Sequence, residues 1–356
     1  MNYVQQLTDV IKSIQPVSRA LEQQVQAHLD NLTKPRGSLG RLEWIAKRYC
    51  LILNTLRPVI PRKAVFVFAG DHGVAEEGVS AFPKEVTAQM VYNFLKGGAG
   101  INVLARHAGA DVRVVDMAVD WDFEGVNGLI HAKVMRGTRN MAKGPAMSEE
   151  EAAKAVLTGV ELARKAVGEG IDLLATGEMG IANTTAASAI TACLCVREPA
   201  EVTGRGTGVS EETWRHKVEV IRRALQVNRP DAQRPLAVLA KVGGAEIAGI
   251  CGLVLGAAAM RRPVIIDGFI STAGALVACC LCPDVRDYIF AAHRSVEQGH
   301  RIQLEFMGLE PLLDLDLRLG EGTGAALAMT LVDAGIKIYS EMATFQAAGV
   351  SAGAEE

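Results

Sequence analysis

Short apolar runs rich in β-branched residues alternate along this chain with longer, alanine-rich segments that have helical spacing. The clearest runs are residues 64–68, 112–117, 171–175, 264–266 and 288–291. Runs of this length and composition predict buried strands. Strands that alternate with helices form a parallel sheet, because each return to the same edge needs a crossover connection. The sequence therefore predicts an α/β fold with a parallel sheet and crossover helices.

The segment 149–167 shows how clearly the helices are marked. Ser148 and Glu151 have the spacing of a capping box, in which each side chain bonds the backbone N–H of the other residue. Small and apolar residues then recur every three or four positions, which predicts one buried face. Gly168 and Gly170 follow, and glycines at this place end a helix.

Both ends of the chain depart from the alternation. Residues 1–49 and 293–348 have helical patterns, and the only strand-like run in them is 312–319. The turn at residues 34–40, with one proline and two glycines, breaks the first of these helical stretches. We therefore expect residues 1–60 and 294–356 to form a small helical domain, and residues 61–293 to form the α/β domain.

Composition narrows the class of protein. The 356 residues include 37 basic and 40 acidic side chains without a long run of one sign, which argues against nucleic acid or a membrane surface as partner. The longest apolar stretch, 247–260, is shorter than the about 20 residues that span a bilayer. The seven cysteines and seven histidines have no disulfide or zinc spacing. We expect a cytoplasmic protein without a structural metal.

The run Arg-Leu-Gly-Glu-Gly-Thr-Gly at residues 318–324 isolates one carboxylate. Glu321 is the only side chain in it that can accept a proton, and the three glycines let the backbone turn sharply and approach a ligand. Residues 325–332 continue as a helix, whose dipole would keep a carboxylate at its start ionised, as a general base requires. The alternative is a carboxylate that only satisfies the helix dipole.

Ligands of open parallel sheets lie outside the carboxyl ends of the strands. After the first strand, Asp71 and His72 are either an acid/base pair or turn residues. Residues 176–185 (TGEMGIANTT) combine a strand end, glycines and a helix start, which favours a phosphate site because free amides and the helix dipole point to one spot. The alternative is an ordinary crossover with Asn183 as helix cap.

A third glycine-rich segment covers residues 203–209 and precedes Ser210, a candidate N-cap for the next helix. The glycines permit close approach of the backbone to a ligand. Lys217, about two turns into that helix, is placed to reach an anion. A lone lysine on a helix is more often a solvated surface residue, and that alternative stays open here.

These segments, together with residues 34–40 (KPRGSLG), 241–244 (KVGG) and 267–270 (DGFI), closely resemble the nicotinate-nucleotide:dimethylbenzimidazole phosphoribosyltransferase family over nearly the whole chain. Residues 69–74 read AGDHGV here, where that family has an ADHGV-like segment, which is a small departure. The resemblance implies a Rossmann-like large domain, a small helical domain from both termini and a homodimer. It also implies transfer of phosphoribose from nicotinate mononucleotide to 5,6-dimethylbenzimidazole, which gives α-ribazole 5′-phosphate for the lower ligand of cobalamin, with no cofactor.

The resemblance assigns functions to individual residues. Glu321 falls on the catalytic base, and Glu178 and Lys217 fall on residues that support the reaction. The benzimidazole pocket corresponds to Ser80, Phe82, Gln89 and Met90, in a stretch that looks less alike and leaves the preferred azole open. The remaining substrate-binding positions, for phosphate and ribose, are Gly177, Met179, Gly180, Asn183, Gly206, Gly208 and Gly320.

The implied chemistry needs only one base. The pyridinium of nicotinate mononucleotide leaves C1′ as a neutral ring, so no general acid is required. The attacking benzimidazole becomes more acidic at its second nitrogen, from which Glu321 can accept the proton. Attack opposite the leaving group inverts C1′ from β to α.

Two other functions remain open on the residues alone. A phosphoribosyltransferase that uses the pyrophosphorylated sugar would need carboxylates for magnesium. No paired acidic residues follow a strand here and lead into a Thr-Gly-Gly-type loop. A non-catalytic nucleotide-binding regulator would need the phosphate site but not an isolated Glu321. Turnover without added metal would distinguish the three.

Overall fold

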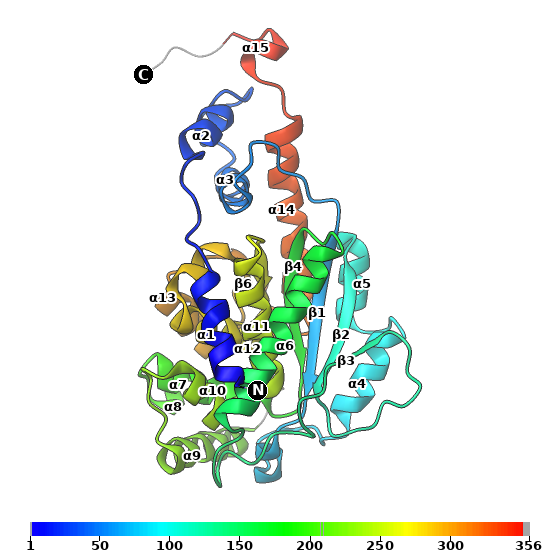
Figure 1. Cartoon of the computed structure of the whole chain (residues 1–356), viewed down its shortest axis with the longest axis vertical. Helices are drawn as coiled ribbons and strands as arrows, with labels where there is room; N and C mark the ends of the chain where they lie inside the picture. Colours follow the sequence, from blue (N-terminus) through cyan, green and yellow to red (C-terminus); the bar gives the residue numbers. More distant parts are fainter. Residues whose placement is uncertain (1, 207, 209, 352–356) are drawn as a thin grey trace.

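A parallel sheet forms the centre of the computed structural model, which describes residues 2–206, 208 and 210–351 (Figure 1). The sheet has seven strands in the order β3-β2-β1-β4-β5-β6-β7, and every neighbouring pair is parallel. The expected α/β fold is confirmed. The strands are β1 (Lys63–Gly70), β2 (Asp111–Ala118), β3 (Leu129–His131), β4 (Leu173–Met179), β5 (Val264–Ile266), β6 (Ile289–His293) and β7 (Pro311–Leu313).

The five apolar runs of the sequence correspond to β1, β2, β4, β5 and β6. The central strand β1 is buried from its second residue to its last, because helices cover both faces of a parallel sheet. The edge strand β3 has only three residues and its pattern gave no signal. The expected strand at 312–319 is limited to Pro311–Leu313, so most of that prediction was wrong.

Helices pack on both faces of the sheet. On one face α11 (Ala245–Ala259) contacts β1, β2 and β4, with α6 (Glu149–Gly168) outside it; on the other, α14 (Thr323–Glu341) contacts β4, β5 and β6. The other helices between β1 and α14 in the chain are α4 (Val86–Leu95), α5 (Gly100–Ala108), α7 (Asn183–Leu194), α8 (Pro199–Val202), α9 (Glu211–Asn228), α10 (Pro235–Val242), α12 (Phe269–Leu281) and α13 (Gln298–Met307), with 3-10 turns η1 (Gly73–Glu77) and η2 (Pro283–Tyr288).

Glycines let α6 and α11 approach until their backbones touch. A Cβ on Gly252 would overlap the carbonyl oxygen of Val156, and one on Gly159 would overlap that of Gly249. The capping box at the start of α6 is present: the Ser148 hydroxyl accepts from the Glu151 N–H, and the Ser148 N–H donates to Glu151 Oε2 at 2.7 Å. Because α11 is buried on nearly all sides, its apolar sequence is that of a core helix.

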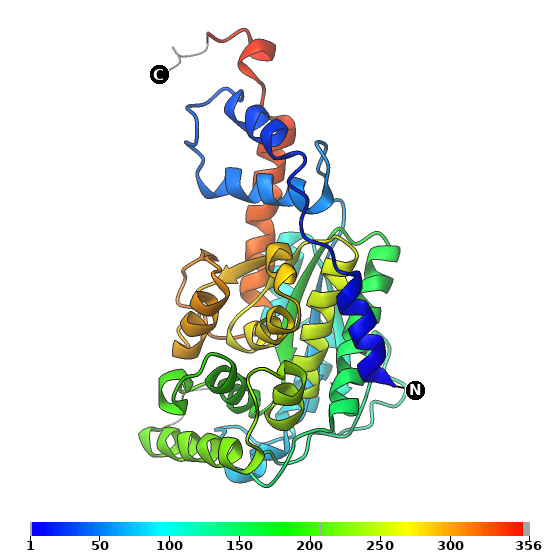
Figure 2. The same cartoon turned by 60° about the vertical axis from the view of Figure 1, so that its left-hand side comes forward.

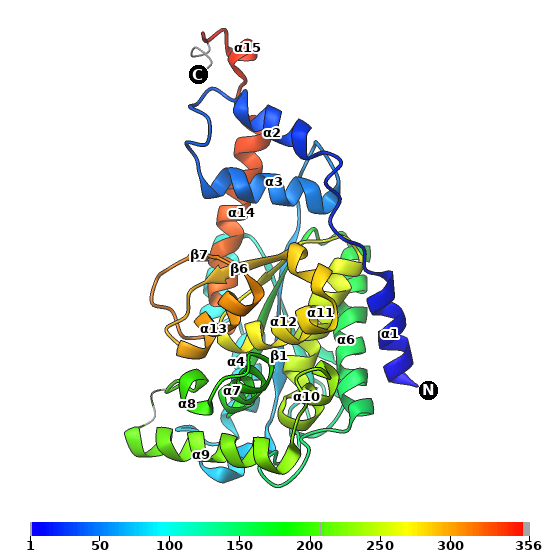
Figure 3. The same cartoon turned by 90° about the vertical axis from the view of Figure 1, so that its left-hand side faces the viewer.

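The terminal helices extend away from the sheet. Figures 2 and 3 show α2 (Glu22–Asp30) and α3 (Arg41–Leu53) beside the upper part of α14, with α15 (Phe345–Ala348) beyond. The turn at residues 34–40 separates α2 from α3, as expected, and the buried Lys34 ammonium lies 2.8 Å from Glu43. In contrast, α1 (Tyr3–Ser13) packs on α6 and α11, and β7 extends the sheet.

Within the part of the chain that the structure describes, no helix is both long and apolar enough to cross a membrane.

Candidate active site

A cavity of about 480 Å³ lies at the carboxyl ends of β4, β5 and β6, where a parallel sheet binds its ligands. It is bordered by the start of α4, the turn between β4 and α7, the start of α12, the segment after β6 and the turn before α14. The residues that line it are Phe82, Val86, Met90, Glu178, Met179, Gly180, Ile181, Asn183, Thr184, Gly206, Gly268, Phe269, Ile270, His293, Ser295, Glu297, Arg318, Leu319, Gly320 and Glu321.

The turn that carries Glu321 has an unusual backbone. Gly320, Glu321 and Gly322 follow one another with φ of 81°, 62° and 93°. A positive φ is free for glycine but costs a glutamate on the order of 1–3 kcal/mol, so the surrounding structure has to impose it. Gly177 in β4 makes this possible, because a Cβ there would overlap the Glu321 carbonyl. The turn therefore rests directly on the backbone of β4.

Glu321 is 6% exposed, and its carboxyl is hydrogen-bonded by a helix other than the one it precedes. Its Oε2 accepts a hydrogen bond of 3.1 Å from the N–H of Ile101, in the first turn of α5. The expectation that α14 supplies the favourable dipole was wrong, because α14 begins at Thr323 while the carboxyl points to α5. Burial raises the pKa of Glu321, and the amides of Ile101 and Gly100 act in the opposite direction.

Glu178 is the second carboxyl of the cavity. Burial, and after it the charge of Asp267, raises the pKa of Glu178 to about 8, so this group is mainly protonated at neutral pH. Asn183 Nδ2 donates to Glu178 Oε2. Asn183 is the first residue of α7 and not its cap. The capping position is Ala182, which has a φ of 73°. A Cβ on Gly320 would overlap Glu178 Oε1, so this glycine lets the two carboxyls approach.

A candidate anion site adjoins the cavity at the start of α7. A smaller cavity of about 40 Å³ shares Gly180, Ile181, Asn183 and Thr184 with the larger one and adds Ser80, Arg205 and Lys217. Lys217 is 1% exposed, and its Nζ donates to Thr184 Oγ1 at 2.8 Å. Burial lowers the pKa of Lys217 to about 8, and Glu297 opposes that shift. Interpreting Lys217 as solvated surface was wrong.

Part of the cavity lining is apolar. Phe82, Met90 and Met179 form it, together with Ile270 and Leu319. Of the other positions assigned to the benzimidazole pocket, Ser80 borders the smaller cavity, and Gln89 is an exposed residue of α4 that does not line the larger cavity. Gly177 lies below the Glu321 turn and not on the cavity wall.

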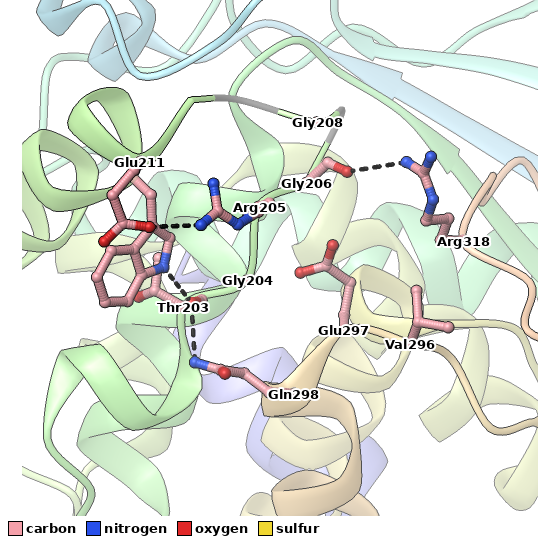
Figure 4. Close-up of a pocket in the computed structure, with 11 residues that line it drawn as sticks. Thr203, Gly204, Arg205, Gly206, Gly208, Glu211, Val296, Glu297, Gln298 and Arg318 are labelled. Carbon is pink, nitrogen blue, oxygen red and sulfur yellow. Dashed lines mark hydrogen bonds and ion pairs between the residues drawn. The ribbon is translucent and has the colours of Figure 1, made fainter.

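An outer pocket of about 570 Å³ opens beside the cavity and shares Gly206, Glu297 and Arg318 with it. Figure 4 shows Arg205 turned towards Glu211, and Arg318 pointing to the Gly206 carbonyl, which its Nη1 reaches at 3.5 Å. Gly208 lines this outer pocket only. Thr207 and Val209 of the glycine-rich segment lie outside the described residues. Ser210 caps α9, as expected, by accepting from the Thr213 N–H.

Asp71 and His72 serve the end of β1 and do not line the cavity. His72 Nε2 lies 2.7 Å from Glu246 Oε1, and both side chains are buried. Asp71 Oδ2 accepts from the N–H of Asp120 at 2.8 Å. An acid/base function for this pair finds no support in that geometry.

Sequence reasoning overlooked the residues that follow β6. His293, Ser295 and Glu297 line the cavity. Asp267, directly after β5, lies beside His293 and does not itself line the cavity. The strand-end argument that selected the segments after β1 and β4 applies equally to β6 and would have found them. Arg318 and Leu319 were in a selected motif but had no function assigned. Among the described residues, no group of three or more His, Cys, Asp or Glu side chains is arranged to hold a metal ion.

The open parallel sheet, the lysine-lined cavity at a helix start and the carboxyl on a strained turn are features of an α/β enzyme. A family model described as "Phosphoribosyltransferase" matches residues 14–350, and the chain belongs to this phosphoribosyltransferase family.

Similar proteins cover the whole chain. A relative from Geobacter metallireducens, named nicotinate-nucleotide--dimethylbenzimidazole phosphoribosyltransferase, is 63% identical over 98% of this chain and 99% of its own length. One of the same name from Chlorobaculum tepidum is 58% identical over 96% and 97%. The crystal structure of CobT from Thermus thermophilus superposes with a TM-score of 0.90 at 51% identity, covering 94% of this chain and 99% of that chain.

Proposed function

We propose that this enzyme transfers the phosphoribosyl group of nicotinate mononucleotide to 5,6-dimethylbenzimidazole, giving α-ribazole 5′-phosphate and nicotinate. The observation that carries the proposal is that Glu321 lines one cavity together with apolar side chains, and that a smaller cavity lined by Lys217 adjoins it. The names of the close relatives support the two substrates.

Two parts of the lining suit the two substrates. The 5′-phosphate lies at the start of α7, where backbone amides and the Lys217 ammonium favour an anion. The planar base lies between Phe82, Met90 and Leu319, since aromatic and thioether groups pack well on flat heterocycles. The ribose then spans the middle, with C1′ near Glu321. Productive placement of two reactants in one cavity is itself a large part of catalysis.

Glu321 is the general base in this proposal. A nitrogen of the benzimidazole attacks C1′ on the face opposite the pyridinium, and the electrons of the breaking bond go to the nicotinate nitrogen. The proton on the second benzimidazole nitrogen moves to the Glu321 carboxylate. The Ile101 amide keeps the carboxylate in place and opposes the effect of burial on its pKa.

Glu178 and Lys217 support the reaction without exchanging protons with the substrate. With a pKa of about 8, Glu178 is mainly neutral at pH 7, which avoids a second negative charge beside Glu321. A protonated Glu178 is a hydrogen-bond donor to the ribose or to Glu321. A bound phosphate opposes the lowering of the Lys217 pKa by burial, because the ion pair favours the charged form of the ammonium.

The proposal is tested with the purified chain, nicotinate mononucleotide and 5,6-dimethylbenzimidazole in the presence of a metal chelator. We expect α-ribazole 5′-phosphate, identified as the α anomer by NMR. Activity that appears only with magnesium and the pyrophosphorylated sugar would support the other class of phosphoribosyltransferase. Binding of the nucleotide without any turnover would support a nucleotide-binding regulator.

Three further features are proposed, two from the pattern and composition of the sequence and one, the homodimer, from the resemblance. They are the division into residues 1–60 with 294–356 and residues 61–293, a homodimer, and a cytoplasmic location. Limited proteolysis tests the first and sedimentation velocity the second. Fractionation of the source cells tests the third.

A further inference from the structure

Asp267, the residue that follows β5, accepts hydrogen bonds from the backbone at the start of α14. Its Oδ2 accepts from the N–H of Gly322 at 3.1 Å, and its Oδ1 accepts from the N–H of Ala325 at 2.9 Å. The side chain is 1% exposed. Gly322, at the capping position of α14, has no side chain. Asp267 supplies the cap instead, although it lies more than fifty residues earlier in the chain.

The contact acts on the residue next to the proposed base. Gly322 has φ of 93° and directly follows Glu321, whose own φ of 62° is unfavourable for a glutamate. Burial of Asp267 against two donors of this turn fixes the turn where the Glu321 carboxyl meets Ile101. On the basis of the function proposed above, we propose that Asp267 is a positioning residue that holds the Glu321 turn in its reactive conformation.

Asp267 also contributes charge to the site. His293 of β6 lies across from it, with Nε2 at 3.8 Å from Oδ1. The other titratable groups near it are Glu321 on the turn and Glu178 at the end of β4. Glu246 of α11 also raises the pKa of Glu178. After burial, Asp267 is the first charge that raises the pKa of Glu178, and it raises that of Glu321 as well.

The decisive variant is Asp267→Asn, which keeps the volume, removes the charge and replaces one acceptor by a donor that faces an N–H. We expect kcat to fall about 10- to 100-fold, as for a small misplacement of a reacting group. The KM for nicotinate mononucleotide should change less than about twofold, since the Asp267 carboxyl bonds no part of the anion site. The acid limb of the kcat profile should move to lower pH, because Glu321 ionises more easily without a neighbouring negative charge.

Thr272→Val is the matched control. It removes one buried hydrogen bond, which His300 Nε2 donates to Thr272 Oγ1 at 2.9 Å, without touching the turn, so the pH profile should keep its position. Asp267→Ser, which retains a capping hydroxyl, serves as the second variant and should shift the acid limb in the same direction.

The outcomes separate this proposal from the function on which it rests. A wild-type enzyme that makes no α-ribazole 5′-phosphate contradicts the function. A wild-type enzyme that does, combined with an unmoved acid limb or an unchanged kcat in folded Asp267→Asn, overturns the positioning function. Failure of both Asp267 variants to fold, judged by circular dichroism, overturns it as well and makes Asp267 a folding residue.

Discussion

At the scale of single residues, the site separates two carboxyls that lie in one cavity. Glu178 is enclosed and has a pKa of about 8, while Glu321 receives the amide of Ile101. Burial raises the pKa of both carboxyls, but at Glu321 the amides of Ile101 and Gly100 oppose that rise, so the two groups have different surroundings, as paired carboxyls with different functions do.

Replacement of Glu321 by glutamine is the first prediction. Glutamine keeps the size and most hydrogen bonding but cannot accept a proton, so kcat should fall roughly 10²- to 10⁴-fold. The melting temperature and the affinity for nicotinate mononucleotide should stay close to wild type. Steady-state kinetics on the purified variant provide the measurement, and a near-normal kcat would show that Glu321 is not the base.

The second prediction concerns stability and pH. The pKa of Glu178 is about 8 in the folded enzyme, against a reference value of 4.5, so the folded state binds its proton more tightly than the unfolded state does. The contribution is present in full below about pH 4.5 and is lost as pH rises towards 8. The Glu178→Gln variant lacks this loss. Its melting temperature should therefore gain on wild type between about pH 5 and pH 8, and parallel curves would contradict the assignment.

At the scale of elements, the start of α7 combines a backbone site with a buried ammonium. The strand β4 ends in the turn at Gly180, where a Cβ would overlap the carbonyl of Gly70, so the turn is pressed against β1. Lys217 reaches it from α9 through Thr184. The anion site is therefore assembled from three elements and not from the β4–α7 segment alone.

The third prediction tests this anion site with two ligands. Nicotinate riboside, which lacks the phosphate, should bind much more weakly than nicotinate mononucleotide in wild type. Lys217→Met should weaken the nucleotide about 30-fold or more, the cost of truncating one partner of a buried charge pair, and leave the riboside nearly unchanged. Titration calorimetry measures both; an equal loss for the two ligands would place the phosphate elsewhere.

At the scale of the whole molecule, the contact between α6 and α11 joins the outer helix layer to the sheet. Gly252→Ala is the fourth prediction: the new methyl would overlap the carbonyl of Val156, and overpacking of this kind costs typically about 1–3 kcal/mol. The melting temperature should fall, with unchanged kcat per folded molecule. Gly168→Ala, at the end of α6 where a Cβ meets nothing within 4 Å, is the control. Equal melting temperatures for the two variants would contradict the tight contact.

Strong local patterns made much of this molecule predictable, and long-range contacts limited the rest. The capping box of α6 and the apolar run of β1 depend on neighbouring residues, so both were found. Burial of Lys217 depends on Thr184, and the alternative of Asn183 as a cap failed because Ala182 adopts a positive φ. The cap that Asp267 gives to α14 likewise joins distant segments, which no local pattern reveals.

The glycines around Glu321 have a consequence for how such an enzyme can diversify. Side chains at Gly177, Gly320, Gly322 or Gly324 would run into β1, β4, His293 or the Glu321 turn itself, so these positions have almost no freedom to drift. Phe82 and Leu319, which line the same cavity, are 50% and 60% exposed and face no such limit. Mutational libraries should therefore yield altered base preference from the exposed rim, while the chemical step is inherited unchanged.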